Sequence, residues 1–237
     1  RIYRNRALTL DEQNQLGSAL TAEYGISNVL FEATGAELSE GVVSVPSSPT
    51  FVPLPYESAV WDADTLAGTN GSAVSTWAST NGVLSATLAA AGISGATAPA
   101  LQTAAINSHS AVRFVGAQKS VLCIPAAQSP VAGATNFTVA FVFRTDTPGR
   151  TADQWYNSVG VIDAEQAGAT YDWGIAFTGD GRVAGGIGNS DVTVFSKPFD
   201  LCDGLPHIAV VSYNAIGSST LVMVDGLNVC RAVGFHA

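Results

Sequence analysis

Charged side chains are scarce in this sequence of 237 residues, and basic ones are the scarcest. Only 12% of the residues are charged, and 10 Lys and Arg stand against 19 Asp and Glu, for a net charge of −9. Soluble domains usually contain ~25% charged residues. Nucleic acids and anionic membrane surfaces attract proteins through clustered Lys and Arg, so the sequence excludes both as expected partners. A neutral glycan or a neighbouring protein subunit remains as the expected partner.

Cysteines and long apolar runs are also few. Cys123, Cys202 and Cys230 show no metal-binding spacing and no dense disulfide framework. Cys202–Cys230 is the first disulfide to test, because both residues fall late in one set of strands; one disulfide or none are both open. The uncharged stretch Thr65–Asn107 is rich in small polar residues and contains Pro99, so no membrane insertion is expected.

The N-terminal segment predicts one long helix, over residues 10–24. Thr9 and Glu12 have the spacing of a capping box, and Gly25 can end the helix with a positive φ angle. Apolar side chains recur every four residues in one stripe, formed by Leu16, Leu20 and Tyr24. The closely spaced prolines of residues 27–57 then indicate an extended linker, with a short strand at 41–45 as one candidate.

After Ala59 the sequence consists of short β-rich runs separated by turn residues. Phe137–Arg144 is apolar on both faces, which predicts a central strand covered on both sides. The pattern predicts an all-β fold, an antiparallel jelly-roll β-sandwich with one N-terminal helix. The expected strands are 111–115, 137–144, 158–162, 172–177, 182–187, 192–195, 207–213 and 220–224.

An ordered series of motifs opens this β-rich region. It runs Val60-Trp-Asp-Ala-Asp64, Gly71-Ser-Ala-Val-Ser-Thr-Trp77, Pro99-Ala-Leu101 and Asn107 to Gly116, and Val224-Asp-Gly226 follows near the end. The series resembles the concanavalin A-like lectin/glucanase superfamily, in its laminin-G-like jelly-roll branch. The resemblance implies that Trp61 and Trp77 fill the core. Ser79-Thr-Asn-Gly82 departs from the usual Asp-x-x-Gly-Asn, which weakens any calcium role there.

The N-terminal segment resembles the closing strand and helix of the same domain type, which usually stand at its C-terminal end. The resemblance implies three parts: residues 1–26 as the closing segment of one copy, 27–57 as a linker, and 58–237 as most of a second copy. We therefore expect residues 1–26 to pack on their own domain or on a neighbouring copy, burying the apolar stripe. The second arrangement would make the protein a homo-oligomer.

Catalytic motifs are missing. Related glucanases place their carboxylates on one strand as Glu-x-Asp-x-x-Glu, and retaining enzymes hold the two reacting groups about 5–5.5 Å apart. Asp163 and Glu165 are the nearest match, but the third acid is absent, so they predict a solvated turn. His109, His207 and His236 are widely spaced and no Gly-x-Ser-x-Gly motif is present. We predict that the protein is not an enzyme.

No cofactor is expected. Asp62 and Asp64 are weak candidates for holding Ca²⁺, but the oxygen ligands of a calcium loop do not follow them, which favours a cap or turn role. Zinc spacing of His and Cys is absent.

Neutral sugars are held by aromatic faces together with amide or carboxylate groups. The polar, aromatic loop around Trp155, Tyr156 and Asn157 predicts such a site, and Asn189 and Asp191 lie in a second candidate loop. Trp173 begins a strand, where a groove role and a core role are both open.

The sequence thus favours a non-catalytic, lectin-like jelly-roll module of a larger extracellular, cell-surface or virion protein that binds glycan or mediates adhesion. The alternative is a structural or assembly module with protein–protein contacts only, such as a decoration, spacer or fibre unit. A glycoside hydrolase is the least favoured interpretation.

Overall fold

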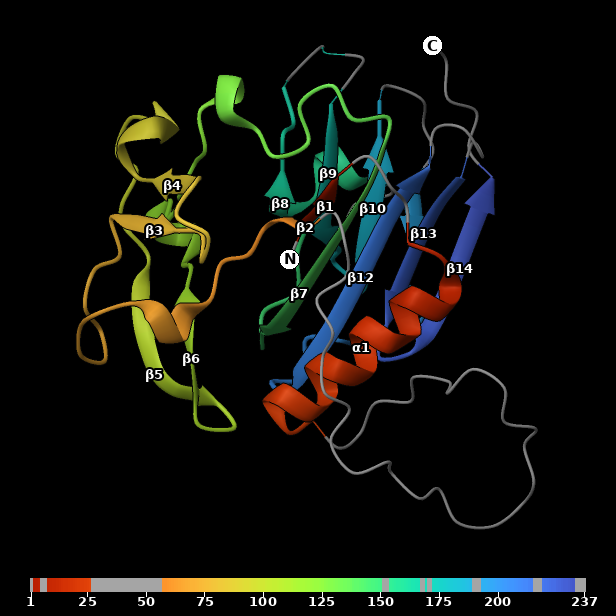
Figure 1. The fold of residues 1–237 in the computed structure, drawn as a ribbon, viewed down its shortest axis with the longest axis horizontal. Helices are drawn as coiled ribbons and strands as arrows, with labels where there is room; N and C mark the ends of the chain where they lie inside the picture. Colours follow the sequence, from red (N-terminus) through yellow and green to blue (C-terminus); the bar gives the residue numbers. More distant parts are fainter. Residues whose placement is uncertain are drawn as a thin grey trace. The chain divides into compact units, whose positions relative to one another are not determined.

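The computed structural model describes residues 2–4, 8–26, 57–150, 154–166, 169, 172–188, 193–214 and 219–232 (Figure 1). The chain forms two compact units: unit 1 contains Arg1–Arg4 and Leu54–Ala134, and unit 2 contains Asn5–Pro53 and Thr135–Ala237. This division falls inside the range 58–237 that the sequence predicts as one domain. The boundaries expected at residues 26 and 57 stay a prediction, and the candidate strand 41–45 lies outside the described residues.

Unit 1 consists of short antiparallel strand pairs joined by 3₁₀ turns. The pairs are β1 (Ile2–Arg4) with β2 (Glu57–Ala59), β3 (Thr76–Ala78) with β4 (Ser85–Thr87), and β5 (Ala100–Ile106) with β6 (His109–Arg113). The turns are Ala63–Thr65, Ala89–Ala91, Gly116–Gln118 and Ala126–Gln128.

The expectation that Trp61 and Trp77 fill the core is wrong, because both stay half-buried in unit 1. Each indole N–H instead holds the loop in place. Trp61 Nε1 donates to the Trp77 carbonyl at 3.0 Å, and Trp77 Nε1 donates to the Asp62 carbonyl at 3.2 Å.

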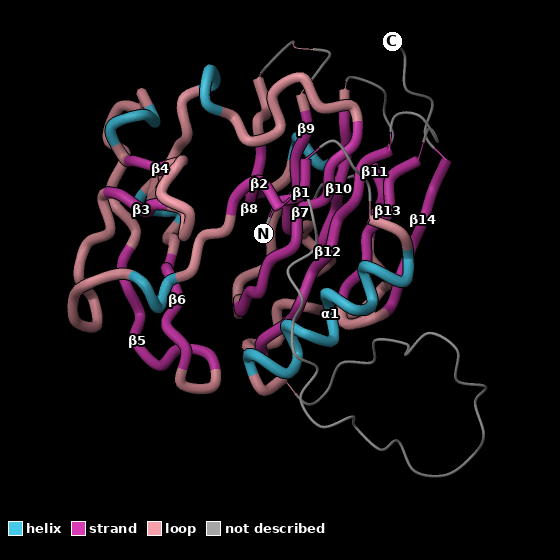
Figure 2. Tube along the Cα trace, in the orientation of Figure 1, coloured by secondary structure: helices cyan, strands magenta, loops and turns pink. Residues whose placement is uncertain are grey.

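Unit 2 is an antiparallel β-sandwich (Figure 2). Within this unit, the first sheet has the order β14-β13-β12-β7 and the second has the order β11-β10-β9-β8. The first sheet contains β7 (Asn136–Arg144), β12 (Pro206–Asn214), β13 (Ser219–Val224) and β14 (Leu227–Ala232). The second contains β8 (Val159–Asp163), β9 (Trp173–Phe177), β10 (Val183–Ile187) and β11 (Thr193–Phe195), after a 3₁₀ turn at Trp155–Asn157.

Alternating side chains of the first sheet face the second sheet and form the core. The Phe137 ring lies 4.9 Å from the Trp173 ring, and the Tyr213 hydroxyl donates to the Gly174 carbonyl across the layers at 2.9 Å. On the other face of the first sheet, Thr138 and Ser212 are buried and their hydroxyls lie 2.8 Å apart. The predicted coverage of this strand on both faces is therefore confirmed, although β7 is the last strand of the first sheet within unit 2.

The helix α1 (Leu10–Tyr24) covers that other face, where it runs across the first sheet in Figure 1. It begins and ends where its sequence predicts. Thr9 and Glu12 form the capping box, and Gly25 ends the helix with φ 61°. A capping side chain of this kind typically contributes about 1 kcal/mol to stability.

The helix packs on its own chain, the first of the two arrangements expected from the sequence. Gln13 Nε2 donates to Ser212 Oγ at 3.1 Å and to the Leu8 carbonyl at 2.7 Å. Leu16 and Leu20 are buried, while Tyr24 stays half-buried because it lies in the last turn. Two of the three side chains of the predicted stripe are thus fully enclosed.

The predicted all-β class, an antiparallel sandwich with one N-terminal α-helix in the described part of the chain, is confirmed. Among the residues that the structure describes, no helix combines the length and the apolar character needed to cross a lipid bilayer.

Candidate functional site

A pocket of about 220 Å³ opens on the second sheet of unit 2. Gly174 and Gly186 are opposite each other on β9 and β10, and both face the Trp155 ring; their neighbour Gly185 faces Val211 and Val222 of the first sheet. The face of the second sheet that carries Trp155 is therefore the outer face of the sandwich. We call this the outer pocket, lined by Trp155, Tyr156, Ser158, Gly160, Asp163 and Glu165.

The sequence-based interpretation of Trp155 as an outward-facing sugar platform is wrong, because the residue is only 2% exposed. Its indole lies flat on the two glycines, where any side chain would collide with the ring. The Trp155 backbone N–H donates to Thr193 Oγ1 at 3.0 Å. The indole Nε1 is buried and has no hydrogen-bond partner in the described part of the chain.

The residues that follow Trp155 remain accessible. Tyr156 is 39% exposed, and its ring stands perpendicular to the Trp155 ring at a centroid distance of 5.7 Å. Asn157 is exposed at the end of the same turn. Tyr156 and Asn157 are thus presented to solvent beside a buried tryptophan that fixes their position.

The other predicted sugar-binding residues do not join this pocket. Trp173 is 9% exposed and packs against Phe137 and Tyr213, so its core role is the correct one and its groove role is wrong. Asn189 and Asp191 lie outside the described residues.

Asp163 and Glu165, which the sequence predicts to form a solvated turn, are both exposed to solvent and form one wall of the outer pocket. Asp163 is the last residue of β8, and a register shift between Gly160 and Ile162 lets its carboxylate fold back over Gly160. Both residues keep an exposed side. The sequence shows Asp163 and Glu165 close together, but the position of their carboxylates depends on the irregular pairing of β8 with β9.

The Asp163 carboxyl titrates above its ordinary range. Desolvation by the surrounding atoms and the negative charge of Glu165 raise its pKa, while a hydrogen bond from the Glu165 backbone N–H opposes them. In the described ranges, neither carboxylate has a Lys, Arg or His ion-pair partner.

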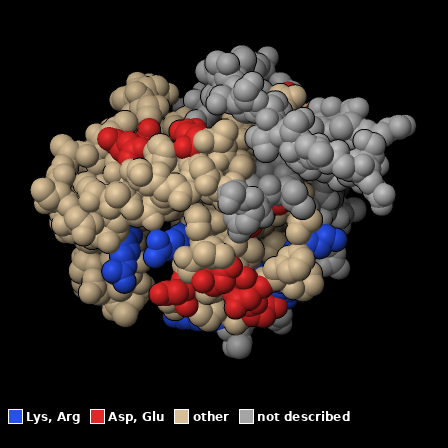
Figure 3. All heavy atoms as spheres, turned by 90° about the horizontal axis from the view of Figure 1, so that it is seen from below, with Lys and Arg blue, Asp and Glu red and all other residues tan. Residues whose placement is uncertain are grey.

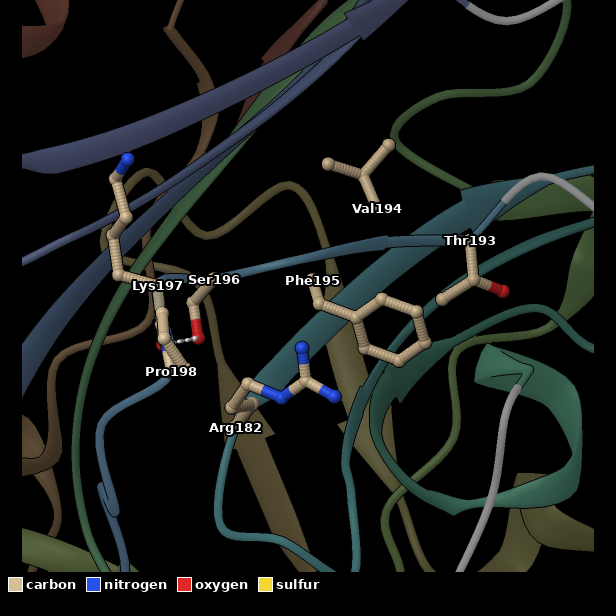
Figure 4. A pocket seen from close by; sticks show the side chains of 7 residues that line it. All are labelled: Arg182, Thr193, Val194, Phe195, Ser196, Lys197 and Pro198. Carbon is tan, nitrogen blue, oxygen red and sulfur yellow. Dashed lines mark hydrogen bonds between the residues drawn. The ribbon is translucent and has the colours of Figure 1, made fainter.

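A second cavity, of about 260 Å³, lies at β11 and is shown in Figure 4. The Arg182 guanidinium lies 4.4 Å from the centre of the Phe195 ring and forms an ion pair with Asp180 at 2.6 Å. The Lys197 ammonium points away from the guanidinium (Figure 4). The two cations therefore do not converge on one ligand position.

Histidines and aspartates form local structural pairs. In unit 2, His207 Nδ1 lies 2.6 Å from Asp225 Oδ2 and its Nε2 lies 3.1 Å from Asp203 Oδ1. Burial lowers the pKa of His207, but the hydrogen bonds and charges of the two aspartates outweigh it, so the pKa is raised.

The weak metal candidates Asp62 and Asp64 have protein partners in unit 1. Asp62 Oδ1 accepts from the Asp64 N–H at 2.9 Å, as the cap of a 3₁₀ turn. Asp64 lies 2.6 Å from His109 Nδ1 and accepts from the Ser110 N–H at 2.6 Å. No group of three or more His, Cys, Asp or Glu positioned to hold a metal occurs among the described residues.

Cys202 is a free thiol, so the Cys202–Cys230 disulfide considered from the sequence is absent. Desolvation and the charges of Asp200, Asp203 and Asp146 raise the pKa of Cys202 to about 11.

No family model matches the sequence. No curated protein matches it either. Among solved structures, the chain is similar to domains LG4-5 of the mouse laminin alpha1 chain, at 19% identity and a TM-score of 0.31. This match covers 41% of the present chain and 24% of the laminin chain. A likeness of this size transfers no ligand or partner, so function has to be inferred from the residues themselves.

Proposed function

We propose that this chain is a non-catalytic binding module of a larger protein at the cell surface, outside the cell or on a virion, and that the outer pocket binds the end of a glycan. One observation supports this most. The pocket combines an exposed Tyr156 ring with the hydrogen-bond acceptors of Asp163 and Glu165.

A polyhydroxylated ligand matches the groups in this wall. Sugar hydroxyls donate to carboxylates and accept from N–H groups, and the apolar face of a sugar ring packs on an aromatic ring. Pockets for drug-sized ligands start near ~300 Å³. The smaller outer pocket is therefore suited to a single sugar ring.

A glycan array tests this function. We expect the protein to bind a subset of glycans and Tyr156→Ala to weaken that binding at least about tenfold, the loss expected when an aromatic contact is removed. Phe199→Ala is the matched control, because Phe199 is 55% exposed and lies outside the pocket. Release of new reducing ends from a bound oligosaccharide would contradict the non-catalytic proposal.

The second candidate is a structural or assembly module whose contacts are with protein only. Exposed apolar side chains favour it: Phe199 is 55%, Leu205 50% and Leu227 40% exposed in unit 2. Absence of binding across a broad glycan panel, together with concentration-dependent self-association that Leu205→Ser abolishes, would select this candidate over glycan binding.

A further inference from the structure

The charge of the outer pocket has one sign. Among the described residues, its lining contains the carboxylates of Asp163 and Glu165 and no Lys, Arg or His. Two carboxylates that share a small, partly desolvated space repel each other. A ligand with a positive group would relieve this repulsion, whereas a neutral ligand would leave it in place.

The aromatic wall favours the same kind of ligand. An ammonium group is attracted to the face of an aromatic ring, by about 0.5–1 kcal/mol at exposed sites and more when desolvated. The Tyr156 ring is accessible, and the buried Trp155 ring beside it, perpendicular at 5.7 Å, holds it in place. The pocket thus contains one aromatic surface and two carboxylates around a space of about 220 Å³.

We propose that the outer pocket selects a sugar with a free amino group, with the ammonium held between Glu165, Asp163 and the Tyr156 ring. This inference rests on the glycan-binding function proposed above and specifies its ligand. A bare Ca²⁺ ion fits the pocket less well, because it takes six to eight oxygen ligands and the wall offers two carboxylates. An acetylated amine carries no charge, and a hydroxyl at the same position carries none either.

Three oligosaccharides of the same length and linkage test the proposal, because they differ only in the group at carbon 2 of each ring. They are the β-1,4-linked tetramers of glucosamine, of N-acetylglucosamine and of glucose. Binding is measured by calorimetry with the full chain, at a pH at which the amine is protonated. We expect the glucosamine tetramer to bind at least about tenfold more tightly than the other two, which corresponds to about 1.4 kcal/mol.

Acidic proteins attract cations without a specific site, and acidic side chains also gather elsewhere on this surface (Figure 3). A matched pair of variants separates the two effects. Glu165→Gln removes one charge in the pocket, and Glu23→Gln removes one charge from an exposed position on α1. We expect Glu165→Gln to abolish the preference for the amine and Glu23→Gln to leave it unchanged.

The outcomes distinguish this inference from the function on which it rests. Equal binding of all three tetramers, lost in Tyr156→Ala, would keep the glycan-binding function and overturn the selection of an amine. A preference for the amine that both glutamine variants reduce equally would show general charge attraction and would also overturn it. Binding of none of the tetramers or of any glycan on the array would overturn both.

Discussion

The indole ring of Trp155 occupies the space in which a side chain at Gly186 would begin. Gly186→Ala should therefore displace the ring and lower the free energy of unfolding by about 1–3 kcal/mol, as overpacking usually does. Gly116→Ala is the control, because a Cβ there meets nothing within 4 Å. Urea unfolding followed by circular dichroism measures both variants. Equal stabilities would mean that Trp155 does not rest on Gly186.

Truncation of Trp155 should cost stability first and binding only as a consequence. Because the side chain is 2% exposed, Trp155→Ala is expected to lower the free energy of unfolding by about 3–5 kcal/mol. Tyr156→Ala, one residue further and 39% exposed, should cost a much smaller amount. Thermal unfolding of the two variants checks this order, and a stable Trp155→Ala protein would contradict the buried position.

The pair of aspartates around His207 makes stability depend on pH. The folded pKa of His207 is raised above the ordinary value of 6.5, so this stabilisation is complete below the unfolded pKa and is lost as pH rises through the folded pKa. The pKa of Asp203 is lowered, because hydrogen bonds from the Leu205 N–H and His207 outweigh its desolvation. Its contribution is therefore lost as pH falls through that lowered folded pKa.

Urea unfolding at a series of pH values from about 6 to 9 measures the histidine contribution. We expect stability to decline across this range in the parent protein and to decline less in His207→Asn. His109→Asn is the control, since His109 belongs to a more exposed pair in unit 1. If His207→Asn retained the full decline, another group would have to be responsible.

Cys202 should react slowly despite being a free thiol. With a pKa of about 11, only about one molecule in a thousand carries the thiolate at pH 8, and the thiolate is the reactive form. Alkylation by iodoacetamide, followed by peptide mass spectrometry, should be much slower at Cys202 in the folded protein than in urea.

Removal of one nearby charge should speed that reaction. Asp146 contributes to the raised pKa of Cys202, so Asp146→Asn should increase the alkylation rate, while Glu23→Gln on α1 should not. Fast alkylation of the folded parent, or recovery of a Cys202–Cys230 disulfide peptide, would contradict the structure.

The helix α1 is held on the first sheet by a buried amide. Gln13→Ala removes the donor to Ser212 and to the Leu8 carbonyl and leaves their oxygens without it, at an expected cost of about 1–3 kcal/mol. Gln15→Ala, at an exposed position of the same helix, should change stability little. Chemical unfolding compares the two, and equal effects would argue against helix docking through Gln13.

The sequence predicted those elements whose causes are local. The capping box of Thr9 and Glu12 and the positive φ of Gly25 fixed both helix ends, and alternating apolar residues located the strands of the sandwich. These signals lie within a few residues of the structure they specify, so no knowledge of the remaining chain was needed.

The candidate site was only partly predictable because its geometry depends on distant pairings. The Trp155 ring packs in the space left open by Gly174 and Gly186. These two glycines are neighbours only because the register of β9 and β10 pairs them. Asp163 faces the pocket through the irregular pairing of β8. Neither relationship has a signature in the local sequence, whereas the exposed polar loop at Tyr156 does.

The hydrogen bond from Tyr213 to Gly174 has a consequence for how this protein can change during evolution. The enclosed phenol spans from the helix-bearing sheet to the strand that lies beneath Trp155, so its length sets the spacing of the two layers. A substitution that shortens or lengthens this side chain has to be matched by a change in the glycines on the opposite strands. Tyr213 and these glycines should therefore be inherited together, even where the surface of the pocket diverges to accept another ligand.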